Sequence, residues 1–218
     1  MIVTVGGIKG GSGKSTVATN LTVIRSQEGR DVLLIDADDQ ETSSDFTILR
    51  NESVEGGAGY TSIKLTGQAV RTETLRLKTK YDDIIIDTGG RDTTSQRSAL
   101  SVSDVLLIPF MPRSFDLWTI DKVGELVGEM SIANPALLTY TFLSKADSRG
   151  TDNDDTAELL KSSERLKFIE PVLGLRKSFS NASAAGLSVT ELKPQDPKAV
   201  EEIMTLYRFV FNVEPTSK

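Results

Sequence analysis

The first twenty residues constrain the fold of this chain more than any other stretch. Residues 1–5 are a short apolar, β-branched run typical of a buried strand, and a glycine-rich loop, IKGGSGKST, follows it. Beyond the loop, Val17, Leu21 and Ile24 recur at helical spacing, and Gly29 stands where a helix would end. A strand, a glycine loop with Lys-Ser, and a helix form the context that a phosphate-binding loop requires. The sequence therefore predicts that phosphate binds at the start of this helix.

The glycine loop also predicts which groups would hold a nucleotide. Its glycines let the backbone fold tightly enough to point successive N–H groups at an anion, and the helix that follows adds its positive dipole end. Lys14 would supply a point charge to the β- and γ-phosphates, and the Ser15 hydroxyl would bind Mg²⁺. The predicted nucleotide-binding residues of the loop are Gly10, Gly11, Ser12, Gly13, Lys14, Ser15 and Thr16.

The loop departs from the common pattern G-x-x-x-x-G-K-[ST], because Ile8 stands where glycine is usual and a second lysine, Lys9, begins the run KGGSGKS. This run resembles the deviant Walker A motif of the ParA/MinD family of partitioning and positioning ATPases. The resemblance implies that the chain binds ATP with Mg²⁺ and forms a homodimer on ATP binding. It also implies that Lys9 reaches across the two-fold axis to the partner's nucleotide, which makes Lys9 and Lys14 predicted catalytic residues.

Composition narrows the chemistry that is open to this chain. Its 218 residues fit one α/β domain spanning 1–218. The chain has no cysteine and no histidine, which excludes disulfides, iron–sulfur clusters, thiol chemistry and the usual general base. Catalysis must therefore use carboxylates, lysines, backbone amides and Mg²⁺. The first strand begins at the N-terminus and no apolar run is long enough to cross a bilayer, so we expect a cytoplasmic protein without stable membrane association.

Strand and helix patterns alternate along the whole chain. The predicted strands are 1–5, 31–36, 60–65 (at an edge), 83–87, 104–109, 136–143 and 169–174. After the helix that begins near Ser15, the predicted helices are 41–50, 67–80, 93–102, 115–131, 156–167 and 197–213, with loops at 51–59 and 151–155 and a turn at 110–114. This alternation predicts an α/β fold: a doubly wound, mostly parallel sheet with helices on both faces, as in P-loop NTPases of the deviant Walker A type.

One aspartate and a pair of glycines follow the predicted strand 83–87, at the sheet edge where α/β proteins gather their ligands. Asp87 comes after three isoleucines, as a Walker B carboxylate does, and would bind Mg²⁺ directly or through water. Thr88-Gly89-Gly90 resembles the second switch of the family, which often has prolines at the last two positions. Glycine there permits the backbone to rearrange when the γ-phosphate is present, so Gly89 is a predicted nucleotide contact.

Asp36-Ala37-Asp38-Asp39-Gln40 resembles the family's first switch, D-x-D-P-Q, with Asp39 in place of proline. The resemblance implies that Asp38 orients or deprotonates the attacking water, that Asp36 lies near the Mg²⁺ and that Gln40 contacts the nucleotide. Asp38 thus joins the two lysines as a predicted catalytic residue. The predicted metal ligands are Ser15, Asp36 and Asp87.

Ser144-Lys145-Ala146-Asp147 lies where the family reads the base, without the asparagine that is frequent there. The same residues resemble the [NT]KxD guanine motif, whose aspartate accepts hydrogen bonds from the ring nitrogens. An ordinary loop fits these residues equally well. Ser144 and Asp147 are the predicted base contacts, and the family resemblance favours ATP over GTP.

The net charge is −6, but basic residues gather in two stretches, 64–80 and 165–177. An acidic chain is not steered to nucleic acid by its overall charge, whereas local patches, doubled in a dimer, can bind phosphates. Residues 175–191 resemble the family's late segment R-x-x-x-x-x-A-x-x-x-G-x-S-V, which makes Arg176 and Lys177 the predicted contacts to DNA. Solvated surface charges give the same pattern, so both interpretations stay open.

Together these features favour a dimeric, nucleoid-associated ATPase of the short ParA branch that positions a plasmid, a chromosome or a carboxysome. Such an ATPase would bind DNA without sequence specificity and would need an adaptor protein that stimulates hydrolysis. A MinD-like ATPase at the membrane is the alternative, although the apolar stripe of the last helix is typical of core packing. That stripe is Val200, Ile203, Met204, Tyr207 and Phe211. A third class, a dethiobiotin-synthetase-like ligase, is disfavoured by Lys9.

Overall fold

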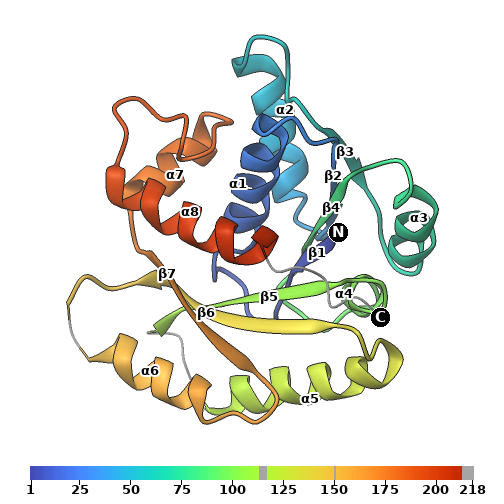
Figure 1. Cartoon of the computed structure of the whole chain (residues 1–218), viewed down its shortest axis with the longest axis vertical. Helices are drawn as coiled ribbons and strands as arrows, with labels where there is room; N and C mark the ends of the chain where they lie inside the picture. Colours follow the sequence, from blue (N-terminus) through green and yellow to red (C-terminus); the bar gives the residue numbers. More distant parts are fainter. Residues whose placement is uncertain (113–116, 150, 213–218) are drawn as a thin grey trace.

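The computed structural model describes residues 1–112, 117–149 and 151–212. Within them, seven strands form one sheet in the order β3-β2-β4-β1-β5-β6-β7, and every neighbouring pair is parallel (Figure 1). Helices cover both faces of this sheet. The predicted doubly wound α/β fold is therefore confirmed.

The burial of each strand follows its place in the sheet. Four of the five inner strands, β1, β2, β4 and β5, are buried at every position, which is why each appears in the sequence as a near-continuous apolar run. The edge strand β3 has no fully buried residue, and the other edge strand, β7, alternates between buried and more exposed residues. The strands are β1 Ile2–Val5, β2 Val32–Ala37, β3 Thr61–Lys64, β4 Asp83–Thr88, β5 Val105–Phe110, β6 Leu138–Ala146 and β7 Lys167–Gly174.

The helices divide between the two faces, because successive strand residues point to opposite sides of the sheet. Val3 and Val5 pack with α1, α7 and α8, whereas Ile2 packs on the other face with α3 and α4. Helices α5 and α6 cover β5 and β6 on that second face. The helices are α1 Lys14–Gln27, α2 Thr42–Ser53, α3 Ala69–Leu77, α4 Thr94–Leu100, α5 Leu117–Ala133, α6 Asp152–Lys161, α7 Lys177–Ala184 and α8 Pro197–Asn212.

Several elements differ from the sequence prediction. Strand β6 continues to Ala146 rather than ending at 143, and α3 spans 69–77 rather than 67–80. Helix α2 continues to Ser53 and shortens the predicted loop at 51–59. Helix α6 spans 152–161 rather than 156–167, because the acidic residues predicted to be a loop form its first turn, where carboxylates stabilise the positive end of the helix dipole. A short helix, α7, lies in the stretch 175–186, for which no element was predicted. Part of the predicted turn at 110–114 and the start of the helix predicted from 115 lie outside the described residues.

The last helix packs its apolar stripe into the core, as predicted. Ile203 and Tyr207 are buried beside α1, and Met204 and Phe211 pack against the same cluster while partly exposed. Val200 is half-buried. Among the described residues, none of the helices combines the length and apolar character that crossing a membrane requires.

Buried polar side chains hold the segment after α7 against α1 and α2. Asn20 of α1 accepts hydrogen bonds from the Val189 backbone N–H and from the Ser188 hydroxyl, both at 2.9 Å. Arg50 of α2 is buried, donates to the Gly186 carbonyl at 3.0 Å and forms an ion pair with Glu191 at 2.7 Å. The G-x-S-V part of the late segment thus has a clear structural role, which is to hold this segment against α1 and α2.

Candidate functional site

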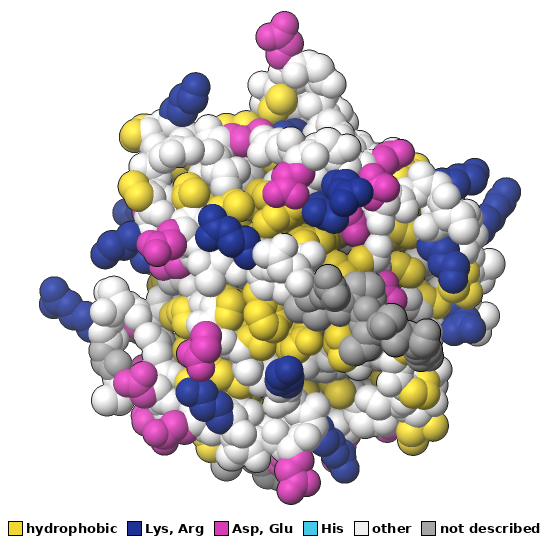
Figure 2. Space-filling model, in the orientation of Figure 1, with side chains coloured by type: hydrophobic (Ala, Val, Ile, Leu, Met, Phe, Trp, Pro, Cys, Tyr) yellow, Lys and Arg dark blue, Asp and Glu magenta, His cyan; other side chains and the backbone are white. Residues whose placement is uncertain are grey.

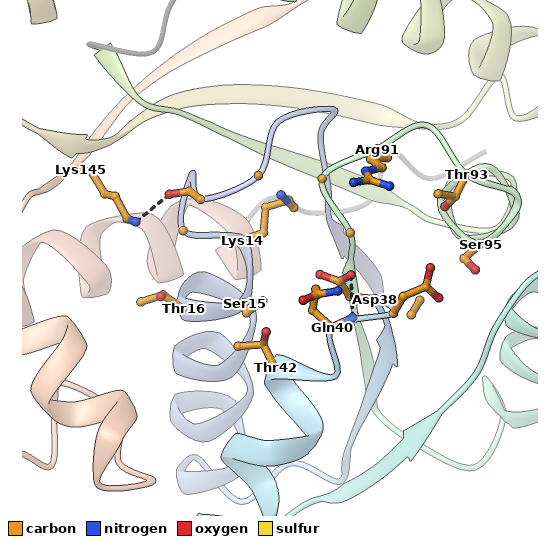
Figure 3. A pocket seen from close by; sticks show the side chains of 17 residues that line it. Lys14, Ser15, Thr16, Asp38, Gln40, Thr42, Arg91, Thr93, Ser95 and Lys145 are labelled. Carbon is orange, nitrogen blue, oxygen red and sulfur yellow. Dashed lines mark hydrogen bonds between the residues drawn. The ribbon is translucent and has the colours of Figure 1, made fainter.

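The register of the sheet brings three distant segments together. Val5 of β1 and Asp36 of β2 both stand beside Asp87 of β4. The segments that leave the carboxyl ends of these strands surround a cavity of about 670 Å³. Residues from 10–16, 37–42 and 89–95, together with Lys145, line this cavity (Figure 3). Ligands of doubly wound sheets bind at this edge.

The cavity collects most, but not all, of the predicted nucleotide contacts. Those that line it are Gly10, Gly11, Gly13, Lys14, Ser15, Thr16, Asp38, Gln40 and Gly89. Ser12 is buried and lies on the other side of the loop, where it lines a small neighbouring pocket with Lys9. Asp36 and Asp87 are fully buried and do not line the cavity.

The Lys14 side chain folds back onto the backbone of the phosphate-binding loop. Gly13 takes a left-handed conformation, with φ of 95°, and α1 begins at the next residue. Lys14 is buried and its Nζ donates to the Lys9 carbonyl at 2.8 Å. Burial lowers the pKa of Lys14, while the charges of Asp87 and Asp38 oppose this effect. A cation in this position is placed to bind an anion inside the loop.

The segment after β2 is organised by its own carboxylates. Asp36 accepts hydrogen bonds from the backbone N–H groups of Asp38 at 3.1 Å and of Ser44, in the first turn of α2, at 2.8 Å. Asp38 accepts from the Gln40 N–H at 3.1 Å. Both Asp36 oxygens are therefore already hydrogen-bonded, and its predicted place near the metal stays a prediction. Asp38 lines the cavity, where a water-orienting carboxylate would have to lie.

Asp87 is in the opposite situation. It is fully buried, and neither of its carboxylate oxygens has a hydrogen-bond partner among the described residues. Burial raises the pKa of Asp87 to about 7, and the charges of Asp36 and Asp38 add to the effect. The hydroxyls of Ser15 and Ser43 lie close enough to oppose the rise without completing a well-formed hydrogen bond. A buried carboxylate with unused oxygens fits Mg²⁺, held directly or through water together with the Ser15 hydroxyl.

Glycine at 89 and 90 allows the segment after β4 to touch the phosphate-binding loop. A Cβ atom on Gly90 would lie 2.6 Å from the Gly10 nitrogen and 2.8 Å from the Lys9 carbonyl carbon. A Cβ atom on Gly89 would lie 2.9 Å from an oxygen of Asp38. The distances from Gly90 are to backbone atoms and are shorter than a Cβ atom tolerates, so the segment after β4 packs directly against the loop, whereas Gly89 adjoins the Asp38 side chain.

The two predicted base contacts, Ser144 and Asp147, lie in different surroundings. Ser144 is buried against the phosphate-binding loop, since a Cβ atom on Gly13 would lie 2.9 Å from its hydroxyl. Asp147 does not line the cavity, and its backbone N–H and carbonyl bond to the Asn153 side chain at 3.2 and 2.8 Å. Base recognition by these two residues stays a prediction.

Two cationic residues of the cavity were not predicted from the sequence. Lys145 has a positive φ of 54°, and its Nζ donates to the Gly11 carbonyl at 2.6 Å. Arg91 follows the two glycines of the segment after β4 and also lines the cavity. The sequence carried a signal for each, because Lys145 lies within SKAD and Arg91 within TGGRD. Only the fold shows that both face the loop.

The two predicted DNA contacts also differ. Arg176 forms an ion pair with Glu202 of α8, with its NH2 group 2.6 Å from a carboxylate oxygen. Lys177, at the start of α7, is exposed. The structure therefore leaves Lys177 as the more accessible of the two cations.

Comparison with known proteins identifies the family. Residues 3–189 match the family described as the CobQ/CobB/MinD/ParA nucleotide binding domain. The chain belongs to this family. The resemblance of its motifs to ParA and MinD is thereby confirmed, and nucleotide binding is the common property of the domain.

Individual relatives are distant. "Maintenance of carboxysome distribution protein A" of Halothiobacillus neapolitanus is 26% identical over 205 residues, which cover 91% of each chain. The fold matches a Cyanothece McdA variant in complex with ATP, with a TM-score of 0.78, 18% identity and 100% and 98% of the two chains covered. It also matches the MinD cell division protein of Aquifex aeolicus, with a TM-score of 0.70, 18% identity and 100% and 99% covered.

Proposed function

We propose that this protein is a Mg²⁺-dependent ATPase of the ParA type. On binding ATP it forms a sandwich dimer that associates with DNA without sequence specificity, and cycles of hydrolysis position or segregate a plasmid, a chromosome or a carboxysome. An adaptor protein stimulates a slow basal rate, and the protein acts in the cytoplasm on the nucleoid. The observation that carries this proposal is that the phosphate-binding loop and Asp38 meet at one cavity, while the buried Asp87 lies beside Asp36 in the register of the adjoining strands.

Each group in or next to this cavity has a defined part in the proposed hydrolysis. The N–H groups of the loop and Lys14 bind the phosphates, and Ser15 and Asp87 hold the Mg²⁺, which neutralises phosphate charge when bound. Asp38 orients the attacking water from the segment after β2. Lys9 reaches the nucleotide of the partner subunit. Since Lys14 bonds to the backbone carbonyl of Lys9, the Lys9 side chain does not take part in that contact.

The experiment that tests the proposal measures mass by light scattering with and without ATP and Mg²⁺. The wild-type protein should change from monomer to dimer only with ATP. Lys9→Ala should remain monomeric and still bind nucleotide, because it keeps the carbonyl that holds Lys14. Lys80→Ala, which removes an exposed cation near the end of α3, is the matched control. An unchanged ATP dimer in Lys9→Ala would remove Lys9 from the partner's site.

DNA binding is tested separately, because the fold separates the two basic stretches. Residues 64–80 belong to β3 and α3 at one edge of the sheet, and residues 165–177 reach from β7 to α7 at the other edge. On the face of the molecule drawn in Figure 2, basic side chains are dispersed rather than gathered in one band. Binding should require ATP and weaken steeply with salt, because it would depend on phosphate contacts.

Single substitutions assign the DNA contacts. Lys177→Ala should weaken DNA binding without changing ATP affinity, and the double substitution with Arg176→Ala should weaken it further. Arg176→Ala alone should act mainly on stability, because it leaves Glu202 without its cationic partner and, among the described residues, with only the Gly174 N–H as a hydrogen-bond donor. Full DNA affinity in the double variant would move the site to the exposed cations of α3 and its end, Arg76, Lys78 and Lys80.

A MinD-like role at the membrane is the second candidate, because the fold also matches MinD. The buried stripe of α8 disfavours it, since Ile203 and Tyr207 are already used in the core. Co-sedimentation with anionic liposomes in the presence of ATP separates the two. Binding to liposomes but not to DNA would favour the membrane role.

A further inference from the structure

Arg91 lines the cavity but has no role in the function proposed for the phosphate-binding loop, Asp38 and Asp87. It directly follows Gly90, is exposed, and lines the cavity. In Figure 3 it lies on the side of Asp38 and Gln40, with Lys145 on the opposite side of the phosphate-binding loop. It therefore faces the end of the site where the proposed water-orienting carboxylate lies.

The guanidinium of Arg91 forms no hydrogen bond or ion pair with any of the described residues, unlike the other two cations of the lining. Lys14 donates to the Lys9 carbonyl, and Lys145 donates to the Gly11 carbonyl. Its neighbour Asp92 is unavailable, because Arg97 binds that carboxylate through two hydrogen bonds of 2.7 Å. A planar fork with five donors at a polar cavity is suited to an oxyanion.

The backbone that carries Arg91 is fixed on both sides. Gly90 is in contact with the Lys9–Gly10 peptide, as described above. Beyond Arg91, Thr93 caps α4 by accepting from the Gln96 N–H at 3.2 Å, and the Gln96 side chain accepts from the Gly7 N–H at 3.2 Å. The Arg91 backbone thus sits beside the phosphate-binding loop without any rearrangement. Such preorganisation is what an electrostatic catalyst requires.

The charges of the site call for another cation. Mg²⁺, Lys14 and Lys145 together balance a fully ionised triphosphate, and Asp36, Asp38 and Asp87 then leave the site negative unless a further cation is present. We propose that Arg91 is a catalytic residue that binds the phosphate oxygens of the nucleotide held by its own subunit. Water forms a bond to the terminal phosphorus, and the bond from that phosphorus to the β–γ bridging oxygen breaks. ADP leaves with this oxygen and its electron pair, and the proton lost by the water ends on the released phosphate. Arg91 stabilises the charge on the transferring group and exchanges no proton. This assignment rests on the proposed function, whose hydrolysis it deepens.

The test compares Arg91→Ala and Arg91→Lys with Arg208→Ala, which removes an exposed arginine of α8. Single-turnover hydrolysis should fall about 10³-fold in Arg91→Ala, as for other arginines that act on a transferring phosphoryl group. ATP affinity should change little, whereas binding of ADP with aluminium fluoride, which mimics the transition state, should be lost. Arg91→Lys should recover part of the rate, and Arg208→Ala should match the wild type.

Mixing variants distinguishes action within a subunit from action across the dimer. If Arg91 serves its own nucleotide, a mixture of Arg91→Ala and Asp38→Ala contains no complete site and stays inactive. Recovery of activity on mixing would show that Arg91 acts on the partner's nucleotide and would overturn the assignment.

Other outcomes are equally decisive. Equal losses of ATP affinity and rate in Arg91→Ala would make Arg91 a ground-state binding residue, and a lowered melting temperature would give it a structural role. Wild-type hydrolysis with an unaffected Arg91→Ala overturns only this inference. Absence of hydrolysis in the wild-type protein overturns the proposed function and the inference together.

Discussion

The β2 segment and the β4 segment, each the carboxyl end of its strand with the residues that follow it, lie side by side but hold their carboxylates in opposite ways. Asp36 and Asp38 accept backbone hydrogen bonds within their own segment and into α2. Asp87, beside Asp36 in register, is buried with both oxygens unpaired among the described residues. The carboxylates of the first segment thus have hydrogen-bond donors within the chain, whereas the second segment contains a carboxylate whose oxygens could bind a cation. This difference supports the proposed division of roles, in which the β2 segment positions the attacking water and the β4 segment binds Mg²⁺.

The largest expected effect separates Asp38 from its neighbours. Asp38→Ala should reduce single-turnover hydrolysis by about 10²–10⁴-fold, the usual contribution of a positioned acid or base, and leave ATP affinity nearly unchanged. The ATP-bound dimer should then persist on DNA. Asp39→Ala is the matched control, because Asp39 is an exposed neighbour in the same segment. A normal rate in Asp38→Ala would transfer the role to Asp36 or Asp39.

The second prediction concerns the metal. Asp87→Asn keeps the shape of the side chain and removes its charge, so the Mg²⁺-dependent part of ATP affinity should fall about 10–100-fold. Isothermal titration with and without Mg²⁺ measures this difference. Asp83→Asn is the control, since Asp83 is a buried carboxylate of the same strand that already pairs with Arg25. Equal Mg²⁺ dependence in wild type and Asp87→Asn would contradict a binding role for the β4 segment.

The third prediction uses the raised pKa of Asp87. The folded protein holds this proton up to about pH 7, whereas the unfolded chain releases it near 3.8. Unfolding in that window releases a proton, so rising pH should destabilise the nucleotide-free wild type relative to Asp87→Asn, by about 1–3 kcal/mol at pH 8. Melting curves at pH 5 and pH 8 test the sign. A constant difference between the two proteins would show that Asp87 is not perturbed.

The smallest effect is expected for Gly90→Ala, which tests the contact between the β4 segment and the loop. Its methyl group would meet the Lys9–Gly10 peptide, and forced overpacking of this kind costs about 1–3 kcal/mol. We expect roughly tenfold slower hydrolysis, because the displaced segment also carries Arg91. Gly124→Ala is the control, since its Cβ would make only an ordinary contact, 3.7 Å from Arg165. Wild-type rates in Gly90→Ala would show that this packing is not needed for hydrolysis.

Most of the fold could be predicted from the local pattern of apolar and polar residues. Four of the inner strands are buried on both faces, so their apolar runs were continuous and unambiguous, and strand–helix alternation then fixed a parallel sheet. Helix boundaries could not be predicted from apolar pattern where polar residues form the first turn of a helix. The acidic first turn of α6 resembles a loop in sequence because its carboxylates act on the helix dipole and not on a core.

The sequence by itself determined the phosphate-binding loop, because glycine spacing, Lys14 and Ser15 act within one short segment whose geometry is local. It also placed Asp38 and Asp87 at strand ends. Only the tertiary structure decided that Asp87 has unused oxygens, that Glu202 binds Arg176, and that Arg91 and Lys145 face the loop. These properties depend on partners far away in the chain, and burial and pairing arise only when the sheet brings such partners together.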